Sequence, residues 1–174
     1  MRSVDRVRDY FVQRGIAIDV KELPASTRTA QLAADAVGTP LGSIVKSLVF
    51  IVDGRAVLAL VAGDMRADPA KIARHMNAPA ARIANANEVR AATSYAIGGV
   101  PPVAHPDGST FAHRAEGQPL ETLVDRTLLR FERVWAAAGA PNAVFEIEMK
   151  KLVELTQGRV EDIVTTDTQG NSLE

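Results

Sequence analysis

The sequence predicts a mixed α/β fold, in which a largely antiparallel, barrel-like mixed sheet is flanked by helices. An apolar hairpin pattern occupies 44–62, strand-like segments outnumber helical ones, and the two kinds are intermixed without a regular βαβ repeat. The 174 residues are 47% hydrophobic and 24% charged, as in ordinary globular proteins. This length suits one domain, expected over 1–166, followed by a polar tail over 167–174.

The first half of the chain begins with a helical pattern. Val4, Val7 and Phe11 recur at helical spacing between a capping Ser3 and a terminating Gly15. The elements expected next are a strand over 16–23, an Ala-rich helix capped by Thr27 or Thr29 and ended by Gly38, strands over 44–52 and 55–62, and helices over 68–77 and 85–94. The two apolar strands are joined by Asp53-Gly54, which is typical of a two-residue hairpin turn.

The second half begins with a Gly/Pro-rich stretch over 95–108, read as the end of a strand that breaks into a loop, and a polar loop over 107–119. A strand is expected over 121–125. The segment 133–139 reads as a strand, although 128–138 also fits a helix. The remaining elements expected are a strand over 142–148, a helix over 149–158 and a last strand over 159–165.

Charge balance and missing residue types exclude several function classes. With 20 Lys+Arg against 21 Asp+Glu, no global positive field draws the chain to nucleic acid or membrane, so RNA binding would need a local patch, and no DNA partner is expected. The absence of cysteine excludes disulfides, thiolate zinc sites and a cysteine nucleophile. His75, His105 and His113 lack metal-ligand spacing, so we expect no metal and no cofactor. The charged N-terminus and the lack of a membrane-length apolar run favour the cytoplasm.

A lysine interrupts the first strand of the hairpin. Lys46 shares a strand face with Leu48 and Phe50, while the opposite face is also apolar, which indicates a central strand covered on both sides. One interpretation is that Lys46 lays its stem on apolar surface and keeps its ammonium in water. The other is a cation at the mouth of an apolar pocket, where it would hold an anionic or carbonyl oxygen strongly.

The stretch Gly98-Gly99-Val100-Pro101-Pro102 is the second informative feature. Two glycines allow the backbone to approach a ligand closely, and the prolines remove two N–H donors. The remaining amides, those of Gly98, Gly99 and Val100, could face a substrate oxygen. A tight corner between a strand and a loop is the structural alternative.

Four stretches in this order, "GSIVKSLVF", "YAIGGVPP", "VWAAAGAPNAVFEI" and "LVELTQGRVEDI", resemble the YbaK-like aminoacyl-tRNA deacylase family, relatives of the editing domain inserted in bacterial prolyl-tRNA synthetase. The resemblance runs from the first helix to Ile163. It implies a mixed α/β barrel-like fold and hydrolysis of the ester that joins a wrong amino acid to tRNA.

The resemblance also implies roles for individual residues. Lys46 matches the lysine at the family's substrate pocket, and Gly98, Gly99 and Pro102 match its glycine–proline loop, which makes Gly99 a backbone donor near the scissile ester. Thr29 and His105 stand at family-like positions. Together with Val100, these residues form the expected substrate site, with Lys46 and Gly99 as its catalytic members.

Contact with RNA is expected at a basic run formed by Arg66, Lys71, Arg74 and Arg82. An equally good interpretation of this run is a solvated helix face. If the run grips phosphates, charge reversal there should weaken binding and flatten its salt dependence.

These features lead to one main functional prediction and two alternatives. The main prediction is a trans-editing hydrolase acting on a mischarged aminoacyl-tRNA that carries a small amino acid such as Ala or Cys, on the tRNA for proline or a related tRNA. Its partners would be the aminoacyl-tRNA acceptor end and a prolyl-tRNA or other synthetase. The alternatives are a non-catalytic tRNA- or synthetase-binding module that uses the same pocket, and a hydrolase of another small ester or amide.

Overall fold

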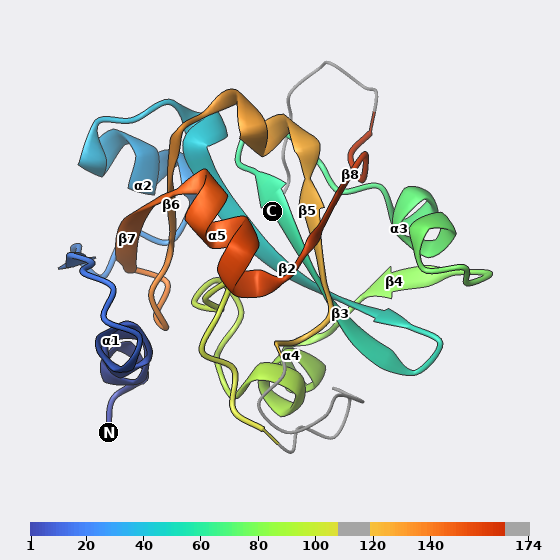
Figure 1. Ribbon diagram of the computed structural model, residues 1–174, viewed down its shortest axis with the longest axis horizontal. Helices are drawn as coiled ribbons and strands as arrows, with labels where there is room; N and C mark the ends of the chain where they lie inside the picture. The colour runs from blue at the N-terminus through green and yellow to red at the C-terminus, as the bar shows by residue number, and fades with distance from the viewer. Residues whose placement is uncertain (108–118, 166–174) are drawn as a thin grey trace.

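A computed structural model of the chain describes residues 1–107 and 119–165 (Figure 1). These residues form one mixed sheet with strand order β1-β7-β6-β2-β3-β5-β8, and β4 pairs with β2. Four ladders are antiparallel and three are parallel. The predicted mixed α/β sheet with flanking helices is therefore confirmed.

The bounds of the elements are as follows. The helices are α1 (Ser3–Gln13), α2 (Ala30–Val37), α3 (Pro69–His75), α4 (Ala86–Thr93) and α5 (Met149–Thr156), with short 3₁₀ turns at Leu41–Ser43 and Arg126–Arg130. The strands are β1 (Val20–Glu22), β2 (Ile44–Val52), β3 (Arg55–Ala62), β4 (Ala81–Ile83), β5 (Thr122–Asp125), β6 (Arg133–Ala137), β7 (Ala143–Glu148) and β8 (Arg159–Glu161).

The hairpin β2–β3 lies at the centre of the sheet, as its apolar faces predict. Asp53 and Gly54 both adopt positive φ, 50° and 74°, as a tight turn between twisted strands requires. All eight residues of β3 pair with β2 in antiparallel register from Val45–Ala62 to Val52–Arg55. This ladder fixes which side chains of β2 share a face.

The two faces of β2 are covered by different elements. One face, with Val45, Val49 and Ile51, packs in a large core together with residues of α1, α4 and α5. The other face is covered in two separate places. At its start Ile44 packs with α2, β6 and β7, and at its end Phe50 and Val52 pack with α3. Figure 1 shows α2 and α3 at opposite ends of β2.

One edge of β2 is paired at both ends but not in the middle. β6 pairs in parallel with Ile44 and Val45, and β4 pairs antiparallel with 50–52. The carbonyl of Val49 accepts from Ala84 N at 2.9 Å, so odd-numbered residues of β2 direct their peptide groups toward this edge. In the part of the sheet that the structure describes, no strand pairs with this edge at 46–48. We call this opening the β2 gap.

Three details of the sequence prediction need correction or completion. The first residue of α1 is Ser3 itself, and its N-cap is Arg2, which makes no side-chain capping bond, so Ser3 is not the cap. The segment 95–97 is no strand, because Tyr95 turns into the core and donates from its hydroxyl to the carbonyl of Ala104. Of the two interpretations of 128–138, the strand is right for its second part, and a 3₁₀ turn precedes it.

Some predictions concern residues outside the described ranges. The domain boundary at 166, the tail over 167–174 and most of the polar loop over 107–119 fall there. Among the helices of the described residues, none combines the length and the hydropathy that a membrane crossing requires.

Candidate functional site

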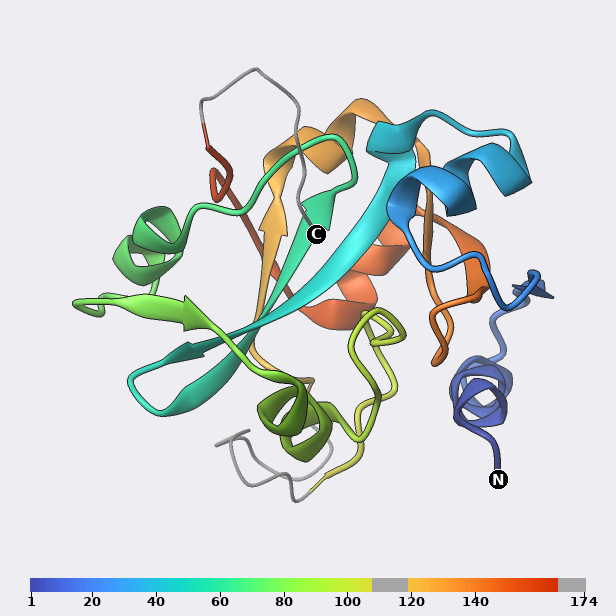
Figure 2. The same ribbon diagram turned by 180° about the vertical axis from the view of Figure 1, so that it is seen from behind.

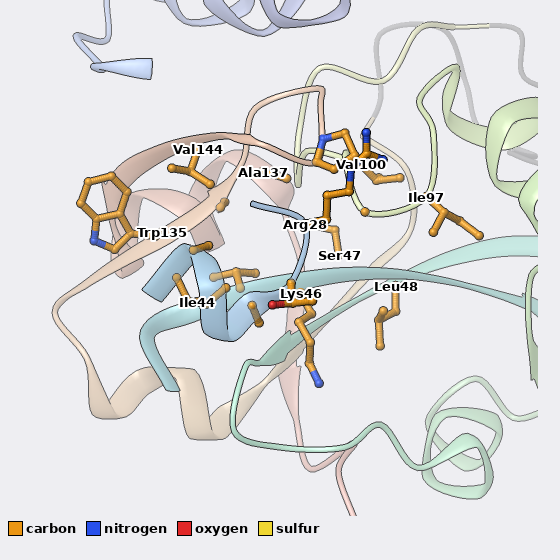
Figure 3. A pocket seen from close by; sticks show the side chains of 17 residues that line it. Arg28, Ile44, Lys46, Ser47, Leu48, Ile97, Val100, Trp135, Ala137 and Val144 are labelled. Carbon is orange, nitrogen blue, oxygen red and sulfur yellow. The ribbon is translucent and has the colours of Figure 1, made fainter. Parts of the chain in front are cut away.

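A hollow of about 220 Å³ opens at the β2 gap (Figure 3). Its walls come from four parts of the chain that are far apart in sequence. They are Arg28–Ala30 and Ala33 at α2, Ile44–Leu48 of β2, Ile97, Gly98 and Val100 of the loop after α4, and Trp135–Ala137, Pro141 and Val144 of the β6–β7 hairpin. Most of these side chains are apolar, and Arg28 and Lys46 are the cations among them.

The N-terminus of α2 forms one wall. Thr29 caps the helix, its Oγ1 accepting from Leu32 N at 3.1 Å, so of the two predicted caps Thr29 is the right one. Thr29 therefore lines the hollow while its hydroxyl already holds the helix. Arg28, which precedes it, is exposed and donates from Nε to the carbonyl of Ala25 at 3.1 Å.

Lys46 lies on the same face of β2 as Ile44 and Phe50. It stands between the part of this face that packs against α2 and the part that packs against α3. The residue is 9% exposed, and its ammonium donates to the carbonyl of Met65 at 2.6 Å. Figure 3 shows the Lys46 side chain pointing away from Val100. The lysine therefore lines the hollow, while its ammonium is directed toward the segment after β3.

Asp64 contributes a negative charge near this lysine. Arg130 holds the Asp64 carboxylate with two hydrogen bonds, Nη2–Oδ1 at 2.7 Å and Nη1–Oδ2 at 3.0 Å. These bonds, with a smaller contribution from the charge of Lys46, keep the pKa of Asp64 below its usual value although partial burial raises it. Asp64 is thus an anion that offsets part of the positive charge beside the hollow.

The glycine–proline loop forms the opposite wall, and Gly98 and Val100 line the hollow directly. Gly98 has φ +82°, a conformation that favours glycine. Gly99 is buried, is not among the lining residues, and donates its amide to the carbonyl of Ala96 at 3.0 Å. A Cβ on Gly99 would lie 2.8 Å from Cα of Ala140. The geometry therefore gives Gly99 a packing role, and its role as a donor to substrate stays a prediction.

A cluster of polar contacts supports the loop from behind. Tyr95 donates to the carbonyl of Ala104 at 2.8 Å, and Nε2 of His105 lies 2.7 Å from the carbonyl of Pro101. The guanidinium of Arg6 lies 4.6 Å from the ring centre of Tyr95. His105, like the buried Pro102, is thus placed behind the loop and is not among the lining residues of the hollow. Figure 2 shows the loop after α4 reaching toward the β6–β7 turn.

Three residues that line the hollow, Ser47, Gly98 and Val100, contribute main-chain polar groups. By the alternation of β2, the N–H and C=O of Ser47 point into the β2 gap. Among the backbone hydrogen bonds of the described residues, none involves the amide of Gly98 or Val100. Ser47 Oγ is also buried without a hydrogen-bond partner in that part of the chain. The hollow thus offers amide donors and carbonyl acceptors within apolar walls.

The predicted RNA-binding residues are not among the residues that line this hollow, and two of them are bound to carboxylates of other segments. Lys71 bonds to Asp162 at 2.9 Å and to the carbonyl of Val164 at 2.7 Å, and Arg82 forms a two-bond ion pair with Glu88. Arg66 and Arg74 are exposed. Two of the four are thus tied to other parts of the chain, and contact with RNA stays a prediction for all four.

No metal centre emerges from the side chains that the structure describes. Within residues 1–107 and 119–165, no three His, Asp or Glu side chains are grouped so as to hold a metal ion.

Comparison with known proteins assigns the chain to a family. Residues 24–155 match the family described as the aminoacyl-tRNA editing domain. The chain belongs to this family. The matched range contains every residue that lines the hollow, so the hollow lies within the part of the chain that matches the editing domain.

Individual relatives agree with this assignment. The chain is 35% identical to "Uncharacterized protein YwhH" of Bacillus subtilis over 91% of its own length and 94% of that protein. It is 36% identical to the proline–tRNA ligase of Lactobacillus johnsonii over 75 residues, which span 13% of that enzyme. Among solved structures, "Crystal structure of a putative trans-editing enzyme for prolyl tRNA synthetase" superposes with a TM-score of 0.83 at 43% identity, covering 95% of this chain and 98% of that one.

The sequence interpretation identified part of this site. It named Lys46, Thr29, Gly98 and Val100, which the fold brings together at one hollow. It did not name Arg28, because a single exposed arginine before a helix cap carries no distinctive pattern. The β2 gap was also missed, since strand partners far apart in sequence leave no local signal.

Proposed function

We propose that this chain is a trans-editing deacylase that hydrolyses the ester between a small amino acid, such as Ala or Cys, and the tRNA for proline or a related tRNA. The supporting observation is the hollow at the β2 gap, where Lys46, the open amides of Gly98 and Val100 and the peptide groups of Ser47 surround one apolar cavity. The family membership supports the same role.

The walls of the hollow support an uncharged, apolar side chain. About 220 Å³ are available, bounded by Ala33, Ile44, Trp135 and Val144. Apolar walls of this kind favour the binding of an aliphatic or thiol side chain, because they exclude water from it. Errors among small amino acids are also those that binding alone discriminates poorly, so a separate hydrolytic step is useful for them.

The reaction needs a positioned water and stabilisation of the developing oxyanion, because an aminoacyl ester is already activated. The amides of Gly98 and Val100 are suitable donors to that oxyanion. Lys46 adds positive potential in a poorly hydrated site, and rotation of its flexible stem from the carbonyl of Met65 would let it reach the substrate. A ribose hydroxyl of the substrate would assist in activating the water, so no protein base is required.

A deacylation assay tests this function. The wild-type chain is incubated with Ala-tRNA and Cys-tRNA for the proline tRNA, beside Lys46→Met and the control Lys150→Met, whose lysine is exposed on α5. We expect wild type and control to hydrolyse at least one ester, and Lys46→Met to lose about 10²-fold or more in kcat/KM, in the range of a lost oxyanion contact. Unchanged hydrolysis by Lys46→Met would contradict the role of the lysine.

The same assay distinguishes the other functions. Binding of tRNA without turnover by the wild type would favour a non-catalytic module, and hydrolysis of small esters with no effect of tRNA would favour a different esterase. A synthetase partner and a cytoplasmic location are both expected for an enzyme with the proposed substrate. Both expectations are tested by showing that the chain acts on this substrate in cells.

A further inference from the structure

A second hollow adjoins the first on the side of β4 and α4. It encloses about 110 Å³. The two hollows share five lining residues, which are Ser47, Leu48, Ile97, Gly98 and Val100. These shared residues include those whose main-chain groups are open. The boundary between the hollows is therefore the place where polar main-chain groups are concentrated, and apolar walls extend from it in two directions.

The remaining walls of the second hollow are aliphatic. Ile83 of β4, Ala84 beside it and Val89 of α4 belong to this hollow and not to the first. Ile83 is 49% exposed and Ile97 is 54% exposed, which makes them two of the few large apolar side chains that face solvent among the described residues. A flat apolar group laid against them would remove this surface from water.

The arrangement of the two hollows matches the order of groups in the proposed substrate. In an aminoacyl-tRNA the amino acid is joined through the ester to a ribose, and the ribose carries the terminal adenine. With the amino acid in the first hollow and the ester at the shared boundary, the base points into the second. Figure 3 shows Ile97 and Leu48 at the opposite end of the first hollow from Trp135 and Val144, as this order requires.

We propose that the second hollow is a binding site for the purine ring of the terminal adenosine. This inference rests on the proposed function and assigns the other end of the same substrate. A purine ring has two apolar faces, and the half-exposed Ile83 and Ile97 supply apolar surface that such a face can cover. No charged side chain lines this hollow, which favours the ring over the phosphates.

The test compares two esters that differ in the base alone. Alanyl-adenosine has the purine, and the alanyl ester of methyl riboside keeps the ribose hydroxyl but lacks the purine. Ile83→Thr keeps a β-branched residue in β4 but removes apolar contact, and Ala84→Leu fills the hollow. Leu129→Thr is the matched control, because Leu129 is 54% exposed on the 3₁₀ turn and lines neither hollow.

We expect Ile83→Thr and Ala84→Leu to raise KM for alanyl-adenosine about fivefold to tenfold, the order of a lost aliphatic contact, with KM for the riboside ester unchanged. Leu129→Thr should alter neither. Equal effects on both esters, or no effect on either, would overturn the adenine site.

A binding measurement separates this inference from the function itself. Adenosine 5′-monophosphate is titrated against the wild type and both variants by NMR, with cytidine 5′-monophosphate as the comparison. Perturbation of Ile83 and Val89 methyl signals by the purine nucleotide, lost in Ala84→Leu, supports the site even if no ester is hydrolysed. Absence of such perturbation in a wild type that does hydrolyse alanyl-tRNA refutes the site and leaves the proposed function standing.

Discussion

Replacement of Gly99 by alanine tests how the glycine–proline loop is held. The added Cβ would lie 2.8 Å from Cα of Ala140 and 3.0 Å from its C and N, whereas ordinary contact begins near 3.4 Å. All three neighbours are backbone atoms, so no side chain can rotate away. The loop and the β6–β7 turn must separate by about 0.6 Å, and overpacking of this kind destabilises proteins by about 1–3 kcal/mol.

The substitution also separates two roles of Gly99. Alanine keeps the backbone N–H, so a role limited to N–H donation would survive, whereas a role in close packing would not. A displaced loop moves the amides of Gly98 and Val100 relative to the hollow, and a misplacement of about 1 Å can lower the rate about 10²-fold. We therefore expect both stability and deacylation to fall in Gly99→Ala.

The measurements are urea denaturation and kcat/KM for deacylation. Gly15→Ala is the control, because Gly15 has φ +66° with nothing within 4 Å of its Cβ position, so strain alone should lower its stability by about 1 kcal/mol without affecting activity. A wild-type midpoint for Gly99→Ala would refute the close contact with Ala140. Lower stability with full activity would refute the positioning of the loop.

Three further substitutions probe other features. Arg28→Ala should raise KM for aminoacyl-tRNA and reduce the salt dependence of binding by a slope of about 1, with hydrolysis of alanyl-adenosine unaffected and the exposed Lys150→Ala as control; an unchanged slope would exclude phosphate contact. Asp125→Ala removes the acceptor of three hydrogen bonds from a buried position and should lower the free energy of unfolding by about 2–4 kcal/mol in urea denaturation, whereas loss below about 0.5 kcal/mol would contradict this view. Hydrogen bonds from Arg82 and from the backbone of Asn85 lower the pKa of Glu88 to about 2, so this stabilisation is present above pH 4.5 and lost as pH falls toward 2. Glu88→Gln should therefore be less stable than wild type at pH 7, by a difference that disappears near pH 2, and a pH-independent difference would refute the ion pair.

Local patterns account for much of the fold. The Asp53-Gly54 turn and the two apolar strands fix the central hairpin, and the helices expected over 68–77 and 85–94 form α3 and α4, which Asp68 and Asn85 cap. The apolar run at 95–97 misled the prediction, because Tyr95 is buried through a tertiary contact with Ala104 and not through a strand ladder. Such contacts depend on residues that come together through the fold alone.

The site was predictable to the extent that it depends on residue type. A lysine within an apolar strand allowed two interpretations, a solvated ammonium or a cation at a pocket, and Lys46 does line the hollow. The basic run was a weaker signal, since Lys71 and Arg82 prove to be bound to Asp162 and Glu88. A run of basic residues in a sequence does not show which carboxylates from other parts of the fold will pair with them.

The β2 gap has a consequence for how such a pocket can change over time. Its hydrogen-bonding groups belong to the peptide backbone, so every residue except proline supplies the same donor and acceptor at Ser47. The cavity walls, by contrast, are side chains such as Ala33 and Trp135. Mutation can therefore remodel the volume of the hollow without changing the donor and the acceptor that the backbone supplies at Ser47, which under the proposed function would alter the accepted amino acid and keep the groups that face its ester.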